Sequence, residues 1–243
     1  MKTKLTLVIA FIGTMFFSAC DEVEQILEET GLTNEEVIQG LKSALSVGTD
    51  TSVTILSAVD GYLGDEVVKI LLPPEAAVIQ QNISKVPGGN LLIESAIKAI
   101  NRAAEDAATE AKPIFVDAIT NITIEDGFAI LNGENDAATM YLRTNTETEL
   151  IQAFTPKIST SLNKKLVGNV SAESTYKALV DAYNAASLNG VLFPKVEDNT
   201  LTEHTTDKAM DGLFIKVADE EAKIRTDVTH RVNDILKKVF AEQ

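Results

Sequence analysis

The sequence lacks most of the residues from which chemical sites are commonly built. Its 243 residues include one cysteine, two histidines and no tryptophan, and aromatic residues make up 5% of the total. One cysteine forms no internal disulfide, so a hydrophobic core has to hold the fold together. Zinc sites commonly use several His or Cys ligands, and neither His204 nor His230 has such a partner at helical spacing. We therefore expect no metal site and no module that stacks sugars on aromatic rings.

Basic residues are also scarce. The chain has 21 Lys and Arg against 36 Asp and Glu, which gives a formal net charge of −15 at pH 7. A field of that sign repels nucleic acid and anionic lipid headgroups. We expect no nucleic-acid partner.

Motifs for nucleophilic catalysis and for cofactor binding are missing from the sequence. It contains no Gly-x-Ser-x-Gly segment, no Walker glycine loop and no dinucleotide-binding glycine pattern. A catalytic serine or cysteine also needs a base beside it. These absences predict no cofactor, and they favour a binding protein over an enzyme.

The one long apolar run lies at the N-terminus. Residues 5–17 follow Lys2 and Lys4 and are mostly apolar. A bilayer span takes roughly 20 apolar residues, so this run suits a signal peptide instead. Phe17-Ser18-Ala19-Cys20 then resembles a lipobox. We expect residues 1–19 to be removed as a lipoprotein signal and Cys20 to carry a diacylglycerol thioether and an acylated amino group such as a palmitoyl amide. The alternative is an ordinary secreted chain with a cysteine at this position by chance.

Residues 20–32 are predicted to form an acidic tether between the lipid and a folded domain. Asp21, Glu22 and Glu24 follow the cysteine directly. Such acidic residues resemble a signal for inner-membrane retention in some bacteria and for surface export in others, and a plain solvated tether explains them equally well. Lipid on Cys20 would make the membrane a partner of the protein. We expect a lipid-anchored protein of the bacterial cell envelope, at the outer membrane, with the periplasmic or surface face left open.

Residues 33–243 read as one helical domain. Signals for helix starts recur along it, and the pairs are Thr33 with Glu36, Thr123 with Asp126, Thr146 with Glu149 and Thr200 with Glu203, together with Ser171 and Asp227 as single caps. Apolar residues with helical spacing precede Pro113, which predicts a long helix that breaks there. Gly40, Ala44 and Gly48 predict close helix packing. The predicted fold class is all-α, a compact multi-helix domain with at most one short β pair near residues 67–72, where an extended arm is the alternative.

Several short motifs in order resemble one family. They are Asp60-Gly61-Tyr62-Leu63-Gly64, Asn101-Arg102-Ala103-Ala104-Glu105, Pro113-Ile114-Phe115, Ile130-Leu131-Asn132-Gly133 with Ala137-Ala138-Thr139, Gly212-Leu213-Phe214, Glu220-Glu221-Ala222-Lys223-Ile224-Arg225 and Leu236-Lys237-Lys238-Val239-Phe240. Together they are similar to the bacterial envelope proteins of the domain of unknown function 4197 family, over roughly residues 36–241. The resemblance implies an exported helical protein and no established activity.

Charged residues lie on the apolar stripes of two predicted helices. Glu220 and Glu221 fall within three or four residues of Val217 and Ile224, with Arg225 one turn after Glu221. A buried carboxylate without a cation is costly. We therefore predict an ion pair between Glu221, or Glu220 if the helix is rotated, and an arginine.

Arg102 and Glu105 offer a second pair on the long central helix. Both pairs fit a structural ion-pair cluster, and both fit a polar pocket in which an arginine holds a small anion and a glutamate acts as acid or base. The first interpretation predicts an envelope lipoprotein that binds a protein partner or a small ligand without catalysis. The second predicts a hydrolase or lyase.

Overall fold

The computed structural model describes residues 33–82, 89–164, 171–196, 201–231 and 234–239. Within these ranges the protein contains helices, turns and no strand, so the predicted all-α fold class is confirmed. None of the helices in these ranges has the length and apolar character needed to cross a membrane. The predicted signal peptide, the lipidation site at Cys20 and the acidic tether all lie outside the described residues.

The first described helix, α2 (Asn34–Ser57), begins at the predicted capping box. The Thr33 hydroxyl accepts from the Glu36 amide at 3.2 Å, and the Glu36 carboxylate accepts from the Thr33 amide at 2.8 Å. The buried face of α2 packs on α9 (Leu201–Thr226). A methyl group added at Gly48 would lie 3.5 Å from Glu220 Cβ. This distance is an ordinary van der Waals contact, so α2 and α9 pack directly at Gly48 and a methyl group there would still fit.

The next two long helices follow one another directly, and the predicted break lies between them. Helix α4 (Gly89–Ala107) passes through the 3₁₀ turn η3 (Ala108–Glu110) into α5 (Ala111–Thr120). Pro113 has no N–H to donate to the Thr109 carbonyl, and its ring crowds that carbonyl. The regular α-helix is therefore interrupted one turn before the proline. Helix α6 (Ile124–Leu131) then begins at the predicted box of Thr123 and Asp126.

The predicted helix start at Thr146 is wrong. Helix α7 (Ala137–Asn163) begins well before it and continues through it, and the buried Thr146 hydroxyl donates to the Leu142 carbonyl within the same helix. A threonine followed by a glutamate three residues later also occurs by chance on a helix surface. An unbroken apolar face carries α7 across this point, and its buried residues include Ala138, Leu142, Leu150, Phe154, Ile158 and Leu162.

Residues 67–72 form the extended arm and not a β pair. The arm leads into the 3₁₀ turn η1 (Pro74–Ala76) and the short helix α3 (Ala77–Asn82). Val68, Ile70 and Leu72 are buried while Val67 and Leu71 are exposed. Buried and exposed residues therefore alternate along this apolar run, and helices, not a second strand, cover its buried side.

The C-terminal part begins with α8 (Ala172–Ala186), which starts at the predicted cap Ser171. After α9 come the 3₁₀ turn η4 (Val228–His230) and α10 (Asp234–Val239). The prediction that Asp227 caps the last helix is wrong. Its carboxylate accepts from the Thr229 amide at 2.8 Å and so caps η4.

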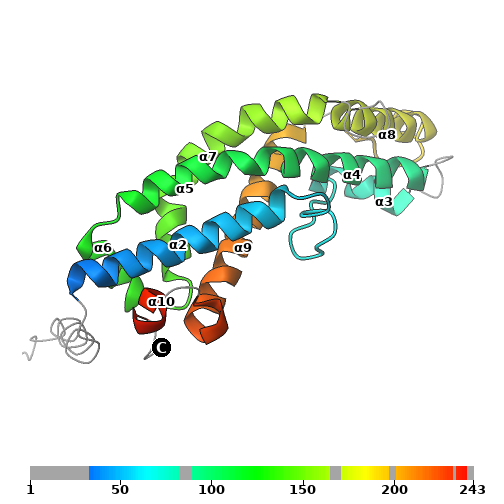
Figure 1. Cartoon of the computed structure of the whole chain (residues 1–243). Coiled ribbons are helices and arrows are strands. Elements are labelled where there is room, and N and C mark those ends of the chain that lie inside the picture. The colour runs from blue at the N-terminus through cyan, green and yellow to red at the C-terminus, as the bar shows by residue number, and fades with distance from the viewer. Residues whose placement is uncertain (1–32, 83–88, 165–170, 197–200, 232–233, 240–243) are drawn as a thin grey trace, which may run out of the picture.

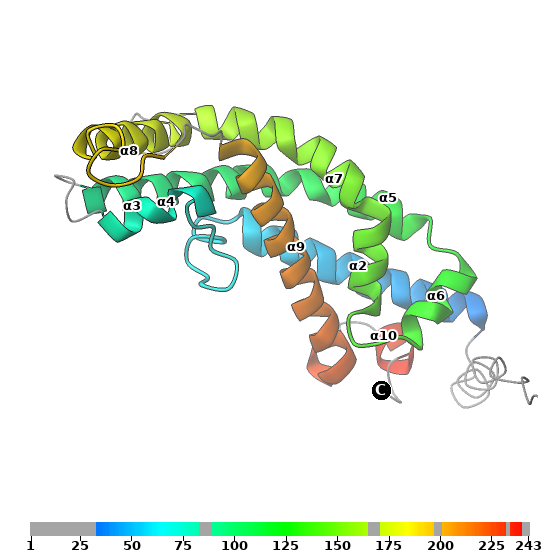
Figure 2. The same cartoon turned by 180° about the vertical axis from the view of Figure 1, so that it is seen from behind.

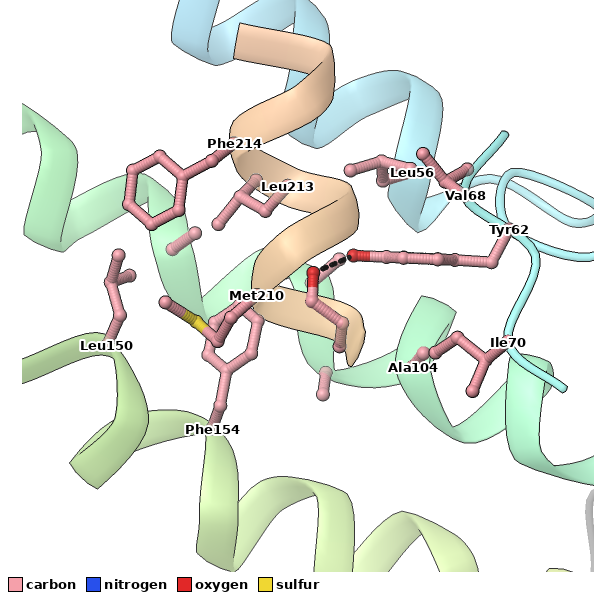
Figure 3. Close-up of a cluster of buried hydrophobic side chains, with 14 of the residues drawn as sticks. Leu56, Tyr62, Val68, Ile70, Ala104, Leu150, Phe154, Met210, Leu213 and Phe214 are labelled. Carbon is pink, nitrogen blue, oxygen red and sulfur yellow. Dashed lines mark hydrogen bonds between the residues drawn. The ribbon is translucent and has the colours of Figure 1, made fainter. Parts of the chain in front are cut away.

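The helices form two crossing layers. Helix α2 and the α4–α5 line lie side by side in one layer, and α7 and α9 lie behind them in Figure 1, where α9 crosses α2 and α4 and packs on α7 (Figures 1 and 2). Helices α6 and α10 lie at one end of the molecule and α8 at the other (Figure 1). Figure 3 shows the middle of the core, where Met210, Leu213 and Phe214 of α9 face Leu150 and Phe154 of α7, with Tyr62 and Val68 on the opposite side of α9.

Candidate functional site

The predicted ion pair on α9 is formed by Glu221 and Arg225. Oε1 of Glu221 accepts from Nε of Arg225 at 3.0 Å and from its Nη2 at 2.9 Å. Glu221 is 8% exposed and Arg225 is 4% exposed. The structure thus brings these two residues together inside the protein, as the sequence indicated.

Glu221 also caps the N-terminus of α7. Its two carboxylate oxygens accept from the amides of Ala138 at 3.0 Å and Thr139 at 2.8 Å, and from the Thr139 hydroxyl at 2.8 Å. Asp136, at the usual capping position, makes no side-chain bond to the helix. The first amides of a helix have no partner within it, and they carry partial positive charge. The N-terminus of α7 is therefore capped by a carboxylate of α9, which is distant in the sequence, and not by a residue next to it in the chain.

Arg225 binds the opposite kind of helix end. Its Nη2 donates to the Ile130 carbonyl at 2.9 Å and its Nη1 to the Leu131 carbonyl at 3.5 Å, both in the last turn of α6. The last carbonyls of a helix lack helical partners and favour a cation. The pair therefore joins the end of α6 to the start of α7.

Arg231 extends this arrangement and was not singled out in the sequence. It is 4% exposed, and its guanidinium donates to the carbonyls of Ile224 at 3.1 Å and Arg225 at 2.7 Å. Both carbonyls lie in the last turn of α9. We call Glu221, Arg225 and Arg231 the capping cluster, because each of its side chains binds a helix end.

Space beside the capping cluster is small. A cavity of about 20 Å³ lies between α2, α7 and α9 and is lined mainly by aliphatic residues, with Glu221 and Arg225 at its edge. A volume of this size holds about one water molecule. The cavity is too small for an organic ligand.

Glu220, the other candidate on α9, is not part of the capping cluster. Its carboxylate pairs with Lys223 at 2.6 Å, and the Lys223 side chain is 47% exposed. The Lys223 end of this pair lies at the protein surface. At the other end, the Cβ of Glu220 would lie 3.5 Å from a Cβ added at Gly48.

The second predicted pair holds a loop. Arg102 Nη1 lies 2.5 Å from Glu105 Oε2, and its Nη2 lies 2.6 Å from Asp60 Oδ1. The other Glu105 oxygen accepts from the amides of Tyr62 and Leu63 at 3.3 and 3.4 Å. Asp60 has a positive φ of 69°. Arg102 and Glu105 thus fix a turn in an unusual backbone conformation.

The same loop is bound on its other side by α9. The Tyr62 hydroxyl donates to the Ala209 carbonyl at 2.8 Å (Figure 3). A Cβ at Gly212 would lie 2.7 Å from the Tyr62 ring, so only glycine leaves room for the ring there. Burial raises the pKa of the Tyr62 hydroxyl well above its usual range, and the Glu105 charge adds to that effect. The hydroxyl therefore serves as a hydrogen-bond donor and stays protonated.

The loop ends in an ion pair that also reaches α9. Asp65 Oδ2 lies 2.6 Å from Lys216 Nζ. The hydrogen bond from Lys216 lowers the pKa of the Asp65 carboxyl below its usual value, and the bond from the Val67 amide acts in the same direction. We call residues 58–66 with Arg102 and Glu105 the loop cluster.

The two clusters are separate. Tyr62 binds α9 at Ala209, and Glu221 lies twelve residues further along the same helix, which corresponds to about 18 Å at 1.5 Å per residue. One small ligand therefore does not touch both Arg102 and Arg225. The structure brings each predicted pair together, but it does not bring the two pairs into one pocket.

The comparisons with known proteins identify the chain by family. A family model described as protein of unknown function (DUF4197) matches residues 31–241. The chain belongs to this family. No curated protein and no solved structure matches it. The family resemblance inferred from the motifs is thereby confirmed, and in this DUF4197 chain the quoted motifs at residues 60–64, 101–105 and 220–225 lie in or beside the two clusters.

Both histidines of this DUF4197 chain have partners within the protein. The ring of His204 lies 2.9 Å from the Leu71 carbonyl, and His230 pairs with Asp227 at 3.0 Å. Among the described residues there is no group of three His, Cys, Asp or Glu side chains that could hold a metal ion.

Sequence reasoning assigned no role to three residues of this architecture, Asn101, Thr139 and Arg231. Asn101 binds the backbone of Ile70 and Arg231 binds the end of α9, while Thr139 donates to the Glu221 carboxylate through its amide and its hydroxyl. No local motif signals these roles, since each depends on a segment that the fold brings to the residue.

Proposed function

We propose that the mature protein is a lipid-anchored component of the cell envelope whose helical domain binds a protein partner without catalysis. The observation that carries the proposal is that the buried charged side chains already bind other groups of the protein. Glu221, Arg225 and Arg231 bind helix ends, and Arg102 and Glu105 bind a loop. These contacts support the structural interpretation of the charges over a ligand pocket.

Catalysis by the buried charges has less support. A general acid or base has to reach the proton that it transfers on the substrate. Both oxygens of Glu221 and both oxygens of Glu105 already accept hydrogen bonds from the protein. The cavity beside Glu221 has room for about one water molecule. The hydrolase or lyase alternative therefore lacks a substrate position beside Glu221.

Shallow grooves on the surface suit a protein partner better than a small molecule. One of about 450 Å³ lies between α2 and α5, where Lys112 pairs with Asp50. Another of about 430 Å³ lies between α5 and α7, beside Glu110 and Glu149. Val116 of α5 is 52% exposed at the first groove. We infer that the partner covers the face formed by α2, α5 and α7, which is seen in Figure 1.

A photo-crosslinking amino acid at Val116 tests this inference in intact cells. We expect one adduct of defined mass from this position, and none from the same amino acid at Ala178, which is exposed on α8. The Val116 adduct should weaken with Lys112→Glu, because the charge beside the groove changes sign. Equal adducts from Val116 and Ala178, or none from Val116, would contradict binding at this face.

The proposed anchor has its own test. Growth with an alkyne-labelled fatty acid should label the wild-type chain and leave Cys20→Ala unlabelled, since the proposed thioether requires the Cys20 sulfur. The labelled protein should sediment with membranes, whereas the variant should appear in the soluble fraction or keep its signal peptide. Labelling of both chains to the same extent would show that Cys20 is not the lipidated residue.

A further inference from the structure

The loop after α8 exposes three large aliphatic side chains within five consecutive residues. Leu188 is 59% exposed, Val191 78% and Leu192 64%. We call residues 188–192 the aliphatic loop. Single exposed apolar residues are common on protein surfaces, but a contiguous group marks an interaction site.

The aliphatic loop is built as a fixed structure. The buried Ser187 hydroxyl accepts from the Gly190 amide at 3.0 Å and donates to the Asn184 carbonyl at 2.8 Å, and the Leu192 amide donates to the Ser187 carbonyl at 2.9 Å. The Asn184 side chain binds both the amide and the carbonyl of Val196 at 2.9 Å. The loop is therefore held at both of its ends.

The backbone of the loop also turns its side chains outward. Leu188 and Asn189 each have a φ of 53°, and Gly190 has a φ of 99°. Left-handed conformations disfavour a residue with a branched side chain such as leucine. Phe193, directly after the loop, packs on Tyr183 with ring centroids 5.1 Å apart. One aromatic residue thus anchors the loop while the aliphatic residues before it remain in solvent.

The charge around the aliphatic loop differs from the rest of the protein. The chain has 36 acidic residues, yet residues 182–196 contain none, and Lys195 is the one charged residue among them. An acidic side chain at this place would resist transfer toward a bilayer, while lysine near a membrane surface is favourable. The aliphatic loop itself therefore carries no acidic residue, with Asp181 before this stretch and Glu197 and Asp198 after it.

We propose that the aliphatic loop inserts into the interfacial region of a lipid bilayer and gives the protein a second membrane contact. The proposal deepens the proposed function, on which it rests for the presence of a membrane. Protein-binding hot spots are enriched in Trp, Tyr and Arg, with Leu and Val under-represented. The exposed residues here are aliphatic, which favours lipid over a protein pocket.

The dimensions of the molecule permit both contacts on one membrane. Thr33 begins α2 at the end of the molecule that holds α6, and the loop follows α8 at the other end (Figures 1 and 2). Helix α7, with 27 residues, is about 40 Å long, and α8 and the aliphatic loop lie beyond its end (Figure 1). A chain of the length of residues 20–32 reaches at most about 45 Å. With the long axis of the domain along the membrane, an anchor on Cys20 and the loop reach the same bilayer.

The absence of tryptophan from the chain permits a direct test. The buried apolar residues of the described core lie between Val37 and Ile224, so a chain that starts at Asp21 keeps that core and has no lipid. We expect the single tryptophan of Val191→Trp to be quenched by phosphatidylcholine vesicles with brominated acyl chains. The matched variant Met140→Trp, on α7, where Met140 is 52% exposed, should not be quenched.

A second variant tests the energy of insertion. Leu192→Asp should weaken partitioning of the unlipidated chain into phosphatidylcholine vesicles about tenfold or more, because a leucine is removed from the apolar contact and a charge is added. Met140→Asp, at an exposed position of α7 to which no binding role is assigned, should leave partitioning unchanged. Far-UV circular dichroism of each variant checks that the fold is retained.

Three results would overturn the proposal. These are no binding to vesicles, equal quenching of both tryptophans, and binding that Leu192→Asp does not change. Self-association that Leu192→Asp abolishes in the absence of lipid would instead assign the loop to contacts between copies. Because the tested chain lacks Cys20, failure here would leave the lipidation test and the Val116 crosslinking test unaffected.

Discussion

Replacing Glu221 by glutamine is expected to lower the free energy of unfolding by about 3–5 kcal/mol, and Arg225→Met by a similar amount. Each change leaves the other member of a buried pair without its charge partner. Glutamine at position 221 also has only one of the two oxygens that accept from the amides of Ala138 and Thr139 at the start of α7. Loss of Arg225 leaves two carbonyls at the end of α6 without this donor. Urea denaturation followed by circular dichroism at neutral pH measures both values.

A matched control has the same spacing on a helix surface. Asp181 and Lys177 form an (i, i+4) pair at 3.4 Å on α8, and their side chains are 64% and 56% exposed. Asp181→Asn should cost about 0–1 kcal/mol, because solvent screens an exposed pair. Glu220→Gln should cost less than Glu221→Gln, since Lys223 is half exposed and no helix end depends on Glu220.

The double variant separates the pair from the caps. If the pairing of Glu221 with Arg225 dominates, the double variant should be less destabilised than the sum of the two single variants. If capping dominates, the two costs should add. Values for Glu221→Gln and Arg225→Met both below about 1 kcal/mol would show that these residues are solvated and that the capping cluster does not hold the α6–α7 junction.

Local signals predicted much of the fold, because many helices begin where a short polar motif meets an apolar stripe. The boxes at Thr33 and Thr123 and the cap at Ser171 are found where predicted. The same motif failed at Thr146, where the apolar face of α7 continues on both sides and overrides it. A capping motif is therefore informative where the apolar periodicity also ends.

The charged residues were predictable as a pair and not as a cluster. Three-to-four-residue spacing on one helix put Glu221 beside Arg225 whatever the tertiary structure. The partners of their remaining donors and acceptors are backbone groups of α6 and α7, more than 80 residues away in sequence. Those contacts depend on how α9 crosses the other helices, which spacing alone does not determine. Arg231 was missed for a different reason, since its partners are six and seven residues away and it reaches them only because the turn η4 folds it back on the end of α9.

Asn101 is the clearest case of a role that the sequence hides. The residue is fully buried, and its Oδ1 accepts from the Ile70 amide at 2.9 Å while its Nδ2 donates to the Ile70 carbonyl at 2.7 Å and to the Ile97 carbonyl at 2.8 Å. One side-chain amide thus supplies the two bonds that a neighbouring β-strand would give to the extended arm. This substitution of an amide for a strand explains how the arm is held without a sheet.

We therefore expect Asn101→Leu to lower the free energy of unfolding by about 2–6 kcal/mol, because leucine fills the space but leaves the amide and the carbonyl of Ile70 buried and unpaired, at about 1–3 kcal/mol each. Asn145→Leu is the matched control, since Asn145 is exposed on α7 and bonds the Tyr141 carbonyl of its own helix; it should change stability by less than about 0.5 kcal/mol. Hydrogen exchange gives a local readout, in which the Ile70 amide should exchange faster in Asn101→Leu and at the wild-type rate in Asn145→Leu. Unchanged protection of Ile70 in a stable Asn101→Leu protein would mean that packing of Val68 and Leu72 holds the arm, and that the amide bonds do not.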